Sequence, residues 1–301
     1  MSDTSVSSPF QLFAQTHRPA IDQALSDYTT YSPDCPGDLA EAIRYSLLAP
    51  GKRLRPLLVL MSADACGCTT SEAIPAACAV EMVHAYSLIH DDLPAMDDDD
   101  MRRGRPSCHA KFGEATAILA GDALLAQAFE TLASGLARAD VAAKCCAILG
   151  KSAGPTQLVG GQAADLSFER AQTSGDEELL RAIHRRKTGA LFLAALRMGA
   201  AIAEATNEQI GSLDTYGKSL GLAFQITDDL LDCNGAEESM GKRVGKDQEK
   251  GKLTFPGLLG IDESRRQGQQ LIQTAIAALD VFRDKASRLE SLAHFVLERN
   301  R

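Results

Sequence analysis

Apolar residues recur at spacings of three and four along almost the whole chain, which is the pattern of amphipathic helices. The expected helical segments are 10–29, 37–48, 53–65, 71–92, 114–135, 138–152, 155–166, 177–201, 206–232 and 265–299. No run alternates with period two long enough to predict a strand, and the polar stretch 234–252 predicts a loop. No linker divides two cores, so residues 1–301 are expected to form one all-α domain, a helical bundle.

Composition and charge narrow the class of protein. Hydrophobic residues make up 45% of the 301 residues and Trp is absent, which suits packed helices. The chain shows no export signal and no apolar run long enough for a membrane span, so we expect a cytoplasmic protein whose eight cysteines are reduced. A net charge of −9 argues against a nucleic-acid partner. The basic residues nevertheless form small clusters, which favours small anions as ligands.

The first acidic cluster, "DDLPAMDDDDMRRG", follows a predicted helix. His84, Ser87 and Asp91 are spaced to share one polar face of that helix. Pro94 cannot donate a backbone hydrogen bond, so the helix must kink or stop near residue 93. That break is required if Asp91 and Asp97 are to converge, because on a straight helix Asp97 would lie about 240° further round the axis and would point away from Asp91.

The second acidic cluster, "FQITDDLLD", lies within a predicted helix. Gln225, Asp228, Asp229 and Asp232 occupy i, i+3, i+4 and i+7, which places them on one stripe surrounded by apolar residues. Burying unpaired carboxylates is costly, so the stripe implies a compensating cation. A solvated surface or a helix cap remains the alternative, and it is an equal one for residues 98–100.

The ligand types indicate which cation fits. All candidate donors are carboxylates without Cys or His at zinc spacing, which favours a hard ion. Mg²⁺ takes one or two carboxylates and completes its shell with water and substrate phosphates. Two acidic walls are therefore expected to hold several Mg²⁺ ions with a diphosphate between them, while Arg and Lys bind the other phosphate oxygens.

These segments resemble the trans-prenyl diphosphate synthase family, and the bacterial farnesyl diphosphate synthases are the most similar members. The two clusters resemble the family's aspartate-rich motifs, and further matches occur in the family's order: "GKRLRP", "EMVHAYSLIHDD", "GGQAADL", "KTGALF" and "GKDQEKGKLTFP". The resemblance covers nearly the whole chain. It implies the all-helical prenyltransferase fold with a deep central cavity, usually in a homodimer, and isoprenoid diphosphates as substrates.

The resemblance also implies roles for individual residues. Asp91 and Asp97, supported by Asp92, would hold two Mg²⁺ ions, and Asp228 would hold a third, with Asp229 and Asp232 either supporting the ligand from behind or acting through water. The residues implied for the allylic diphosphate and the reacting carbons are Arg102, Lys187, Thr188, Gln225, Lys242 and Lys252. Those implied for isopentenyl diphosphate are Gly51, Lys52, Arg55, His84 and Arg103.

Other matched positions are less specific. Tyr86 and Ser87 would lie at the floor of the pocket for the growing chain, and a bulky residue followed by a small one resembles the farnesyl pattern. Gln162 and Asp165 match the family's pattern, but they could equally form hydrogen bonds between packed helices.

The implied reaction is the head-to-tail condensation of isopentenyl diphosphate with dimethylallyl or geranyl diphosphate to give farnesyl diphosphate. A geranyl or geranylgeranyl product is an open alternative. A terpene cyclase would not need Lys52, Arg55 and His84, and its second motif differs from "DDLLD". A non-catalytic synthase subunit tends to lose one aspartate motif, whereas this chain has both.

Overall fold

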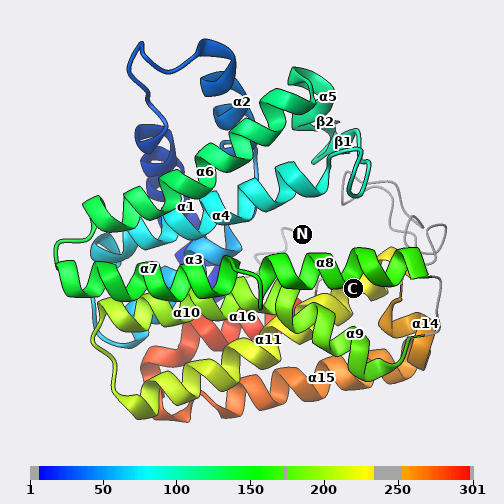
Figure 1. Ribbon diagram of the computed structural model, residues 1–301. Coiled ribbons are helices and arrows are strands. Elements are labelled where there is room, and N and C mark those ends of the chain that lie inside the picture. The colour runs from blue at the N-terminus through cyan, green and yellow to red at the C-terminus, as the bar shows by residue number, and fades with distance from the viewer. Residues whose placement is uncertain (1–6, 172–174, 234–252, 299–301) are drawn as a thin grey trace, which may run out of the picture.

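The computed structural model describes residues 7–171, 175–233 and 253–298, and within them it is almost entirely helical (Figure 1). The helices of the first half are α1 (Pro9–Tyr28), α2 (Gly37–Leu47), α3 (Leu54–Ala65), α4 (Ile74–Asp91), α5 (Cys108–Phe112), α6 (Glu114–Gly135) and α7 (Ala139–Ala153). Those of the second half are α8 (Leu158–Ala171), α9 (Glu177–His184), α10 (Ala190–Ile202), α11 (Asn207–Cys233), α14 (Phe255–Leu259), α15 (Ile261–Ala277) and α16 (Ser287–Glu298). Two 3₁₀ segments, Thr70–Ala73 and Asp280–Ala286, complete the described helices.

Three helices form the centre of the bundle. Helix α4 packs along α6, α3 packs on α10, and α10 packs on α11. Positions 75–83 of α4 are all buried, and α3 and α10 are buried around most of their circumference. A helix that is apolar on every side belongs inside a protein, so the other helices must cover these three. One large core cluster runs from α1 to α16, and a small second cluster joins α11 to α14.

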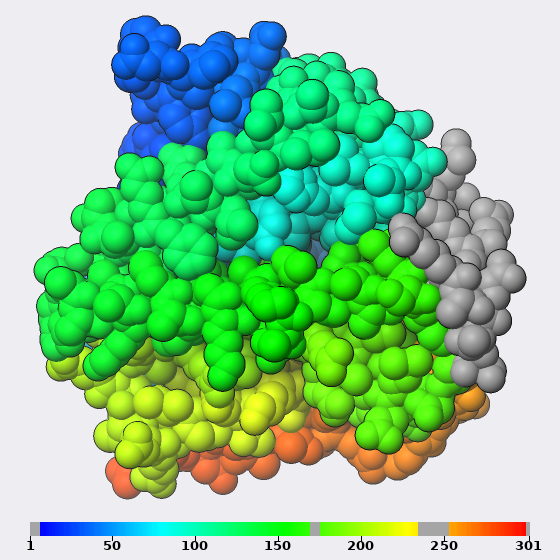
Figure 2. All heavy atoms as spheres, viewed as in Figure 1, coloured from blue at the N-terminus to red at the C-terminus, as the bar shows by residue number. Residues whose placement is uncertain are grey.

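The last turn of the central helix α4 lies at the surface. In Figure 2 the end of α4 and the turn after it, in cyan, lie in a recess between the segment around α6 and the one around α8. The acidic motif at residues 91–100 therefore starts from a rigid, buried helix and ends in an accessible turn. In the described part of the chain, no helix has the length and apolarity needed to cross a membrane. All eight cysteines are free, as expected.

The structure corrects three details of the predicted elements. Met101–Arg102 and Arg105–Pro106 form a short antiparallel hairpin, β1 and β2, where we expected no strand. The predicted helix 177–201 is interrupted by a π-helical turn at Arg185–Gly189. The predicted helix 265–299 is two helices separated by a 3₁₀ segment in which Arg283 has a φ of 51°. Apolar spacing missed these breaks because a single altered turn hardly changes the pattern of buried positions.

Candidate active site

The first aspartate motif folds back on the end of α4. The helix ends at Asp91, and the Asp97 N–H donates to the Asp91 carbonyl oxygen at 2.8 Å. Asp98 has a φ of 51°, in the left-handed region, and the Asp99 N–H donates to the Asp92 carbonyl oxygen at 3.1 Å. The wide turn therefore returns the chain from residue 97 to the last turn of the helix. The predicted helix stop near Leu93 is confirmed.

The Asp91 carboxyl lies in a partly dehydrated position. Burial raises the pKa of Asp91 to about 6, the Lys187 ammonium opposes that rise, and the Asp97 carboxylate adds to it. Lys187, from the π-helical turn, thus faces both aspartates of the motif across the site. A carboxylate held in this way is poised to accept a divalent cation, because a cation relieves the repulsion between Asp91 and Asp97.

Asp91→Asn is expected to raise the Tm of the metal-free protein at neutral pH by roughly 2–6 °C. The folded-state pKa of about 6 exceeds the ordinary 3.8, so the folded protein binds the extra proton between these values. The destabilisation caused by ionised Asp91 is therefore fully present above about pH 6 and is lost as the pH falls through this window. Thermal unfolding in EDTA from about pH 4 to pH 8 measures the difference in Tm between the wild type and Asp91→Asn. A variant that is less stable than the wild type at neutral pH contradicts this prediction.

Lys187 is held in place by helix α8. Its Nζ lies 2.8 Å from Asp165 Oδ2. Burial alone would lower the pKa of Lys187, but the carboxylates of Asp165 and Asp91 outweigh it and raise the pKa, so the ammonium stays charged. The close approach of α8 requires Gly161, because a Cβ there would lie 2.6 Å from the Lys187 backbone nitrogen. Asp165 therefore joins α8 to the π-helical turn through an ion pair with a lysine predicted for the site.

The π-helical turn connects the two acidic motifs. Lys187 faces the first motif, and the next residue, Thr188, donates from Oγ1 to Gln225 Oε1 at 3.0 Å. Gln225 Nε2 donates to Asp229 Oδ1 at 3.0 Å, and the Phe255 N–H donates to Asp229 Oδ2 at 3.0 Å. Each oxygen of Asp229 thus accepts a hydrogen bond from the protein. π-Helical turns recur at functional sites, and this one places two site residues on different walls.

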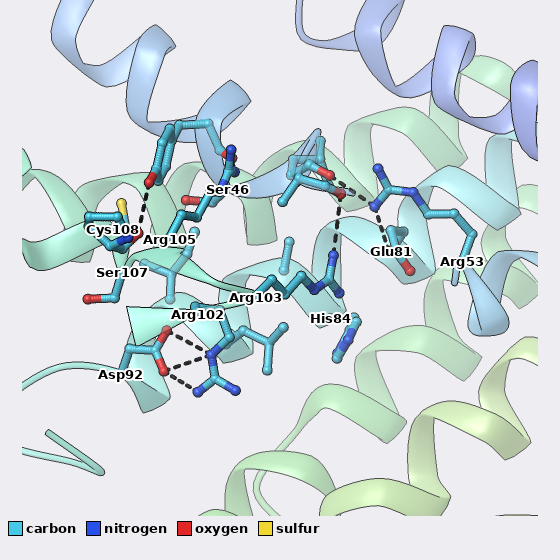
Figure 3. Close-up of a pocket in the computed structure, with 17 residues that line it drawn as sticks. Ser46, Arg53, Glu81, His84, Asp92, Arg102, Arg103, Arg105, Ser107 and Cys108 are labelled. Carbon is cyan, nitrogen blue, oxygen red and sulfur yellow. Dashed lines mark hydrogen bonds and ion pairs between the residues drawn. The ribbon is translucent and has the colours of Figure 1, made fainter. Parts of the chain in front are cut away.

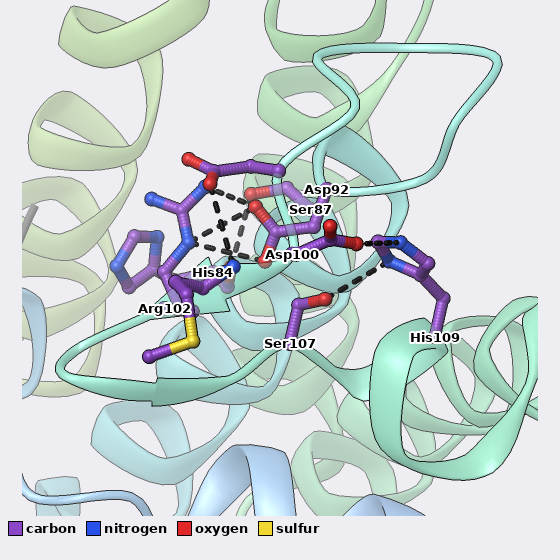
Figure 4. Close-up of polar contacts among 9 residues, drawn as sticks. His84, Ser87, Asp92, Asp100, Arg102, Ser107 and His109 are labelled. Atoms are coloured by element: carbon purple, nitrogen blue, oxygen red, sulfur yellow. Dashed lines mark hydrogen bonds and ion pairs between the residues drawn. The ribbon is translucent and has the colours of Figure 1, made fainter. Parts of the chain in front are cut away.

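Asp92 is the buried partner of Arg102. Arg102 Nε donates to both Asp92 carboxylate oxygens, at 3.0 and 3.1 Å, and Nη2 also contacts Oδ1 (Figure 4). Asp92 is 2% exposed, so the pair is protected from solvent screening on its carboxylate side. Burial opposes the charge of Arg102, but the hydrogen bond to Asp92 outweighs it and raises the pKa. Asp92 therefore fixes the guanidinium at the start of the β1–β2 hairpin.

A second wall of the site is strongly cationic. A cavity of 490 Å³ is lined by Lys52, Arg55, His84 and Arg103, together with residues of α1 and α16. Burial lowers the pKa of Arg55 to about 10, and the Arg55 Nε is buried without a hydrogen-bond partner in the described structure. The guanidinium lies over the Phe192 ring, 5.4 Å from its centroid. A buried cation with an unsatisfied donor indicates that this cavity receives an anion.

His84 and Arg103 complete this cationic wall. Burial, followed by the charges of Arg55 and Arg103, holds the pKa of His84 well below its ordinary value. His84 is therefore neutral at neutral pH, with one donor and one acceptor nitrogen. Arg103, labelled in Figure 3, donates from Nη1 to the Ala49 and Pro50 carbonyl oxygens at 3.3 and 3.1 Å. Gly51 permits this approach, because a Cβ at residue 51 would lie 2.6 Å from Arg103 Nη1.

Arg53 belongs to the same basic cluster in sequence but has a different position. Its Nη1 lies 2.8 Å from Glu81 Oε1, and its Nε lies 2.7 Å from Asp22 Oδ1. Nη1 also donates to the Leu47 carbonyl oxygen at 3.0 Å, so Arg53 joins α1, α2 and α4 (Figure 3). The resemblance assigned Arg53 no role in the site, and the fold gives the reason, because it places Glu81 and Asp22 beside this residue.

The remaining predicted residues occupy several environments. Tyr86 is buried on α4, and its ring and the His90 ring meet edge to face with centroids 5.8 Å apart. The Ser87 hydroxyl donates to the His84 carbonyl oxygen at 3.0 Å.

Asp228 and Asp232 are half-buried on α11. In the described structure, both amide atoms of Gln162 are buried without a hydrogen-bond partner, so a hydrogen bond between packed helices does not account for this side chain. Lys242 and Lys252 lie outside the described residues.

The arrangement of the possible donors limits the kind of metal ion that the site can hold. Among residues 7–171, 175–233 and 253–298, no group of three or more His, Cys, Asp or Glu side chains is arranged to hold a metal ion by itself. That arrangement argues against a zinc or calcium cage made only of protein ligands. It fits Mg²⁺, which combines one or two carboxylates with water and substrate phosphates. Asp91 at the end of α4, Asp97 in the turn that follows and Asp228 on α11 are the residues that would hold it.

Comparison with known proteins places this site in a family. Residues 37–289 match the polyprenyl synthetase family model. The chain is 44% identical to the farnesyl diphosphate synthase of Escherichia coli over 287 residues, 93% of this chain and 95% of that protein. It is 46% identical to the geranylgeranyl diphosphate synthase of Cyanophora paradoxa over 267 residues, 88% of this chain and 89% of that protein.

Solved structures agree with the sequence matches. An FPP/GFPP synthase from Zymomonas mobilis superposes with a TM-score of 0.87 at 36% identity, covering 96% of this chain and 98% of that one. The fold is therefore the all-helical isoprenoid synthase fold, and the protein is a prenyltransferase. The chain belongs to the polyprenyl synthetase family.

Proposed function

We propose that this prenyltransferase makes farnesyl diphosphate, by Mg²⁺-dependent condensation of isopentenyl diphosphate with dimethylallyl and then geranyl diphosphate. The observation that supports the proposal is that one wall of the site is acidic and another is cationic. Asp91 and Asp97 face Lys187 on one wall, while Arg55, His84 and Arg103 line an anion-sized cavity on the other. One wall suits a diphosphate bound through metal ions, and the other suits a diphosphate bound directly by cations.

The acidic wall would activate the allylic substrate. Asp91 and Asp97 would hold two Mg²⁺ ions with Asp92 supporting them through Arg102, and Asp228 would hold a third, supported by Asp229 and Asp232. Bound Mg²⁺ supplies Lewis-acid stabilisation of negative charge on the departing diphosphate. Lys187 and Arg102 add fixed positive charge beside the same oxygens, as would Lys242 and Lys252.

The cationic wall would hold the second substrate. Lys52, Arg55, His84 and Arg103, with the Gly51 backbone, would bind the diphosphate of isopentenyl diphosphate. The allylic C–O bond would break first, with its electron pair going to the diphosphate, and the double bond of isopentenyl diphosphate would then attack the resulting allylic carbocation. One proton then leaves the new chain, and the released diphosphate is the proposed acceptor. Thr188 and Gln225 are fixed by their mutual hydrogen bond, so their dipoles are preorganised for the developing positive charge.

Tyr86→Ala is expected to shift the main product from C15 to C20 or longer. The Tyr86 ring is buried one turn before Asp91, so its removal would deepen the floor of the chain pocket. Chromatographic separation of the products by chain length measures the effect. Tyr86→Phe is the matched control and should keep the C15 product, since it keeps the ring. An unchanged product from Tyr86→Ala would exclude Tyr86 from the pocket floor.

A geranylgeranyl product is the second candidate. It is favoured by the 46% identity to the Cyanophora paradoxa protein, which is named a geranylgeranyl diphosphate synthase. The relative named a farnesyl diphosphate synthase has 44% identity over a longer alignment, so identity alone does not separate the two products. Buried Tyr86 is the feature that favours the shorter product.

The proposal also includes a homodimer. Ile118 and Leu119 on α6 are 43% and 56% exposed, which gives this helix an apolar outer face suited to a second copy of the chain. Light scattering after size exclusion tests it, and a monomeric mass at working concentration would exclude the homodimer.

The direct test is turnover by the purified protein. Isopentenyl diphosphate, dimethylallyl or geranyl diphosphate, and Mg²⁺ are incubated with the protein, and products are separated by chain length with EDTA as the control. A metal-dependent C15 diphosphate supports the proposal. A C20 product would replace the proposed product while keeping the reaction, and activity that persists in EDTA would exclude the metal-dependent mechanism.

A further inference from the structure

Arg18 is a cation on α1 that no part of the proposed mechanism uses. It lines the same 490 Å³ cavity as Lys52, Arg55 and Arg103. Its Nε is buried and has no hydrogen-bond partner in the described structure. A guanidinium carries five donors and cannot release its proton in a protein, so burial without a partner leaves a cost that a ligand could remove.

The carboxylates near Arg18 already have other partners. Asp22 lies one helical turn further along α1, but its Oδ1 is 2.7 Å from Arg53 Nε. Glu81 is the single carboxylate among the described residues that line the cavity, and its Oε1 is 2.8 Å from Arg53 Nη1. An acidic neighbour therefore does not explain why Arg18 lies in this position.

The charge around the cavity points to an anion. Among the described residues, Arg18, Lys52, Arg53, Arg55 and Arg103 line it, and the carboxylate of Glu81 is already paired with one of them, Arg53. Like charges around one cavity repel each other, and an anion bound among them offsets this repulsion because it attracts each of them. A diphosphate carries several oxygens that planar guanidinium groups bind in pairs, which makes it a better match than a single carboxylate.

Helix α1 is anchored so that Arg18 stays at the cavity. The Phe10 and Phe295 rings pack with centroids 5.1 Å apart, and the Phe10 N–H donates to Ser291 Oγ at 3.2 Å. Phe10, Phe295 and Val296 line the cavity beside Arg18, so α1 and α16 together form its outer wall. Arg18 therefore lies on a fixed helix rather than on a loop.

We propose that Arg18 is an additional binding residue for the diphosphate of the isopentenyl substrate, delivered by α1 to the cavity of Lys52, Arg55 and Arg103. This inference rests on the proposed function, since it takes that cavity as the isopentenyl diphosphate site. Arg18 faces the cavity and not the Asp91–Lys187 wall. It acts on the affinity for this substrate and leaves both the chemical step and the affinity for the allylic substrate unchanged.

Arg18→Met and Arg18→Lys test the inference, because Met keeps the length of the side chain without its charge and Lys restores a charge. Arg18→Met is expected to raise the KM for isopentenyl diphosphate about tenfold, with kcat and the KM for geranyl diphosphate unchanged. Arg18→Lys should recover part of that loss. The dissociation constant of isopentenyl diphosphate, measured calorimetrically without Mg²⁺, should rise by the same factor and does not depend on turnover.

Arg288→Met is the matched control. Arg288 also contacts α1, with its guanidinium 5.0 Å from the Phe13 ring centroid, and pairs with Asp64, but it does not line the cavity. It should leave the KM for isopentenyl diphosphate unchanged. A wild-type KM and dissociation constant in Arg18→Met would overturn the inference, and so would equal changes in both substrate KM values with a lower Tm. If the wild type binds isopentenyl diphosphate but turns nothing over, the proposed function fails while the binding comparison still tests Arg18.

Discussion

Asp91→Asn is expected to lower kcat with Mg²⁺ about a thousandfold, because the amide neither carries charge nor bridges metal ions as a carboxylate does. Asp91 is the residue at which the rigid end of α4, the Asp97 turn and the Lys187 ammonium meet. Steady-state turnover at saturating substrate measures the effect, and circular dichroism verifies the helical fold. The same substitution should stabilise the metal-free protein. That result would show that the Asp91 charge costs stability and is kept because the function needs it.

Asp100→Asn is the matched control for Asp91→Asn. Asp100 belongs to the same run of aspartates, but its side chain is 82% exposed and lies 3.4 Å from His109 Nε2 (Figure 4). It should keep turnover within about twofold of the wild type, since exposed substitutions have small effects. Near-normal turnover in Asp91→Asn, or an equal loss in Asp100→Asn, would show that Asp91 is not a metal ligand.

Arg53→Met is expected to lower the free energy of unfolding by about 3–5 kcal/mol. The Arg53 and Glu81 side chains are 3% and 4% exposed, so the substitution leaves a carboxylate buried without its cation. Urea unfolding in the absence of ligands measures the loss. Because Arg53 joins α1, α2 and α4, this change should weaken the scaffold of the cationic cavity rather than one local contact.

Two further variants separate charge burial from side-chain size. In Arg53→Met with Glu81→Gln, the unpaired charge is gone, and at least half of the lost stability should return. Arg138→Met is the surface control, because Arg138 also forms two ion pairs, with Asp140 and Glu204, but is 54% exposed. It should cost no more than about 1 kcal/mol. Equal losses in Arg53→Met and Arg138→Met would contradict the assignment of a buried structural ion pair.

The sequence predicted those features that depend on spacing within one helix or turn. Spacings of three and four gave the helices, and Pro94 gave the stop near Asp91. The Gln225 to Asp232 stripe placed its polar residues on one helix face, because helical periodicity fixes direction from spacing alone. The absence of zinc-type ligands similarly favoured Mg²⁺ from chemistry that needs no coordinates.

Contacts between distant segments required the tertiary structure. Arg53 and Arg55 are two residues apart and both line the cavity, yet Arg53 is paired with Glu81 and Asp22, while the Arg55 Nε has no hydrogen-bond partner in the described structure. No local pattern separates them, because the deciding carboxylates come from other helices. The π-helical turn at Lys187 was hidden for a related reason, since one altered turn hardly changes apolar periodicity but rotates the residues after it. Local spacing thus determined which side chains share a helix face or a turn. Packing decided which of these side chains are paired, buried or open to a ligand.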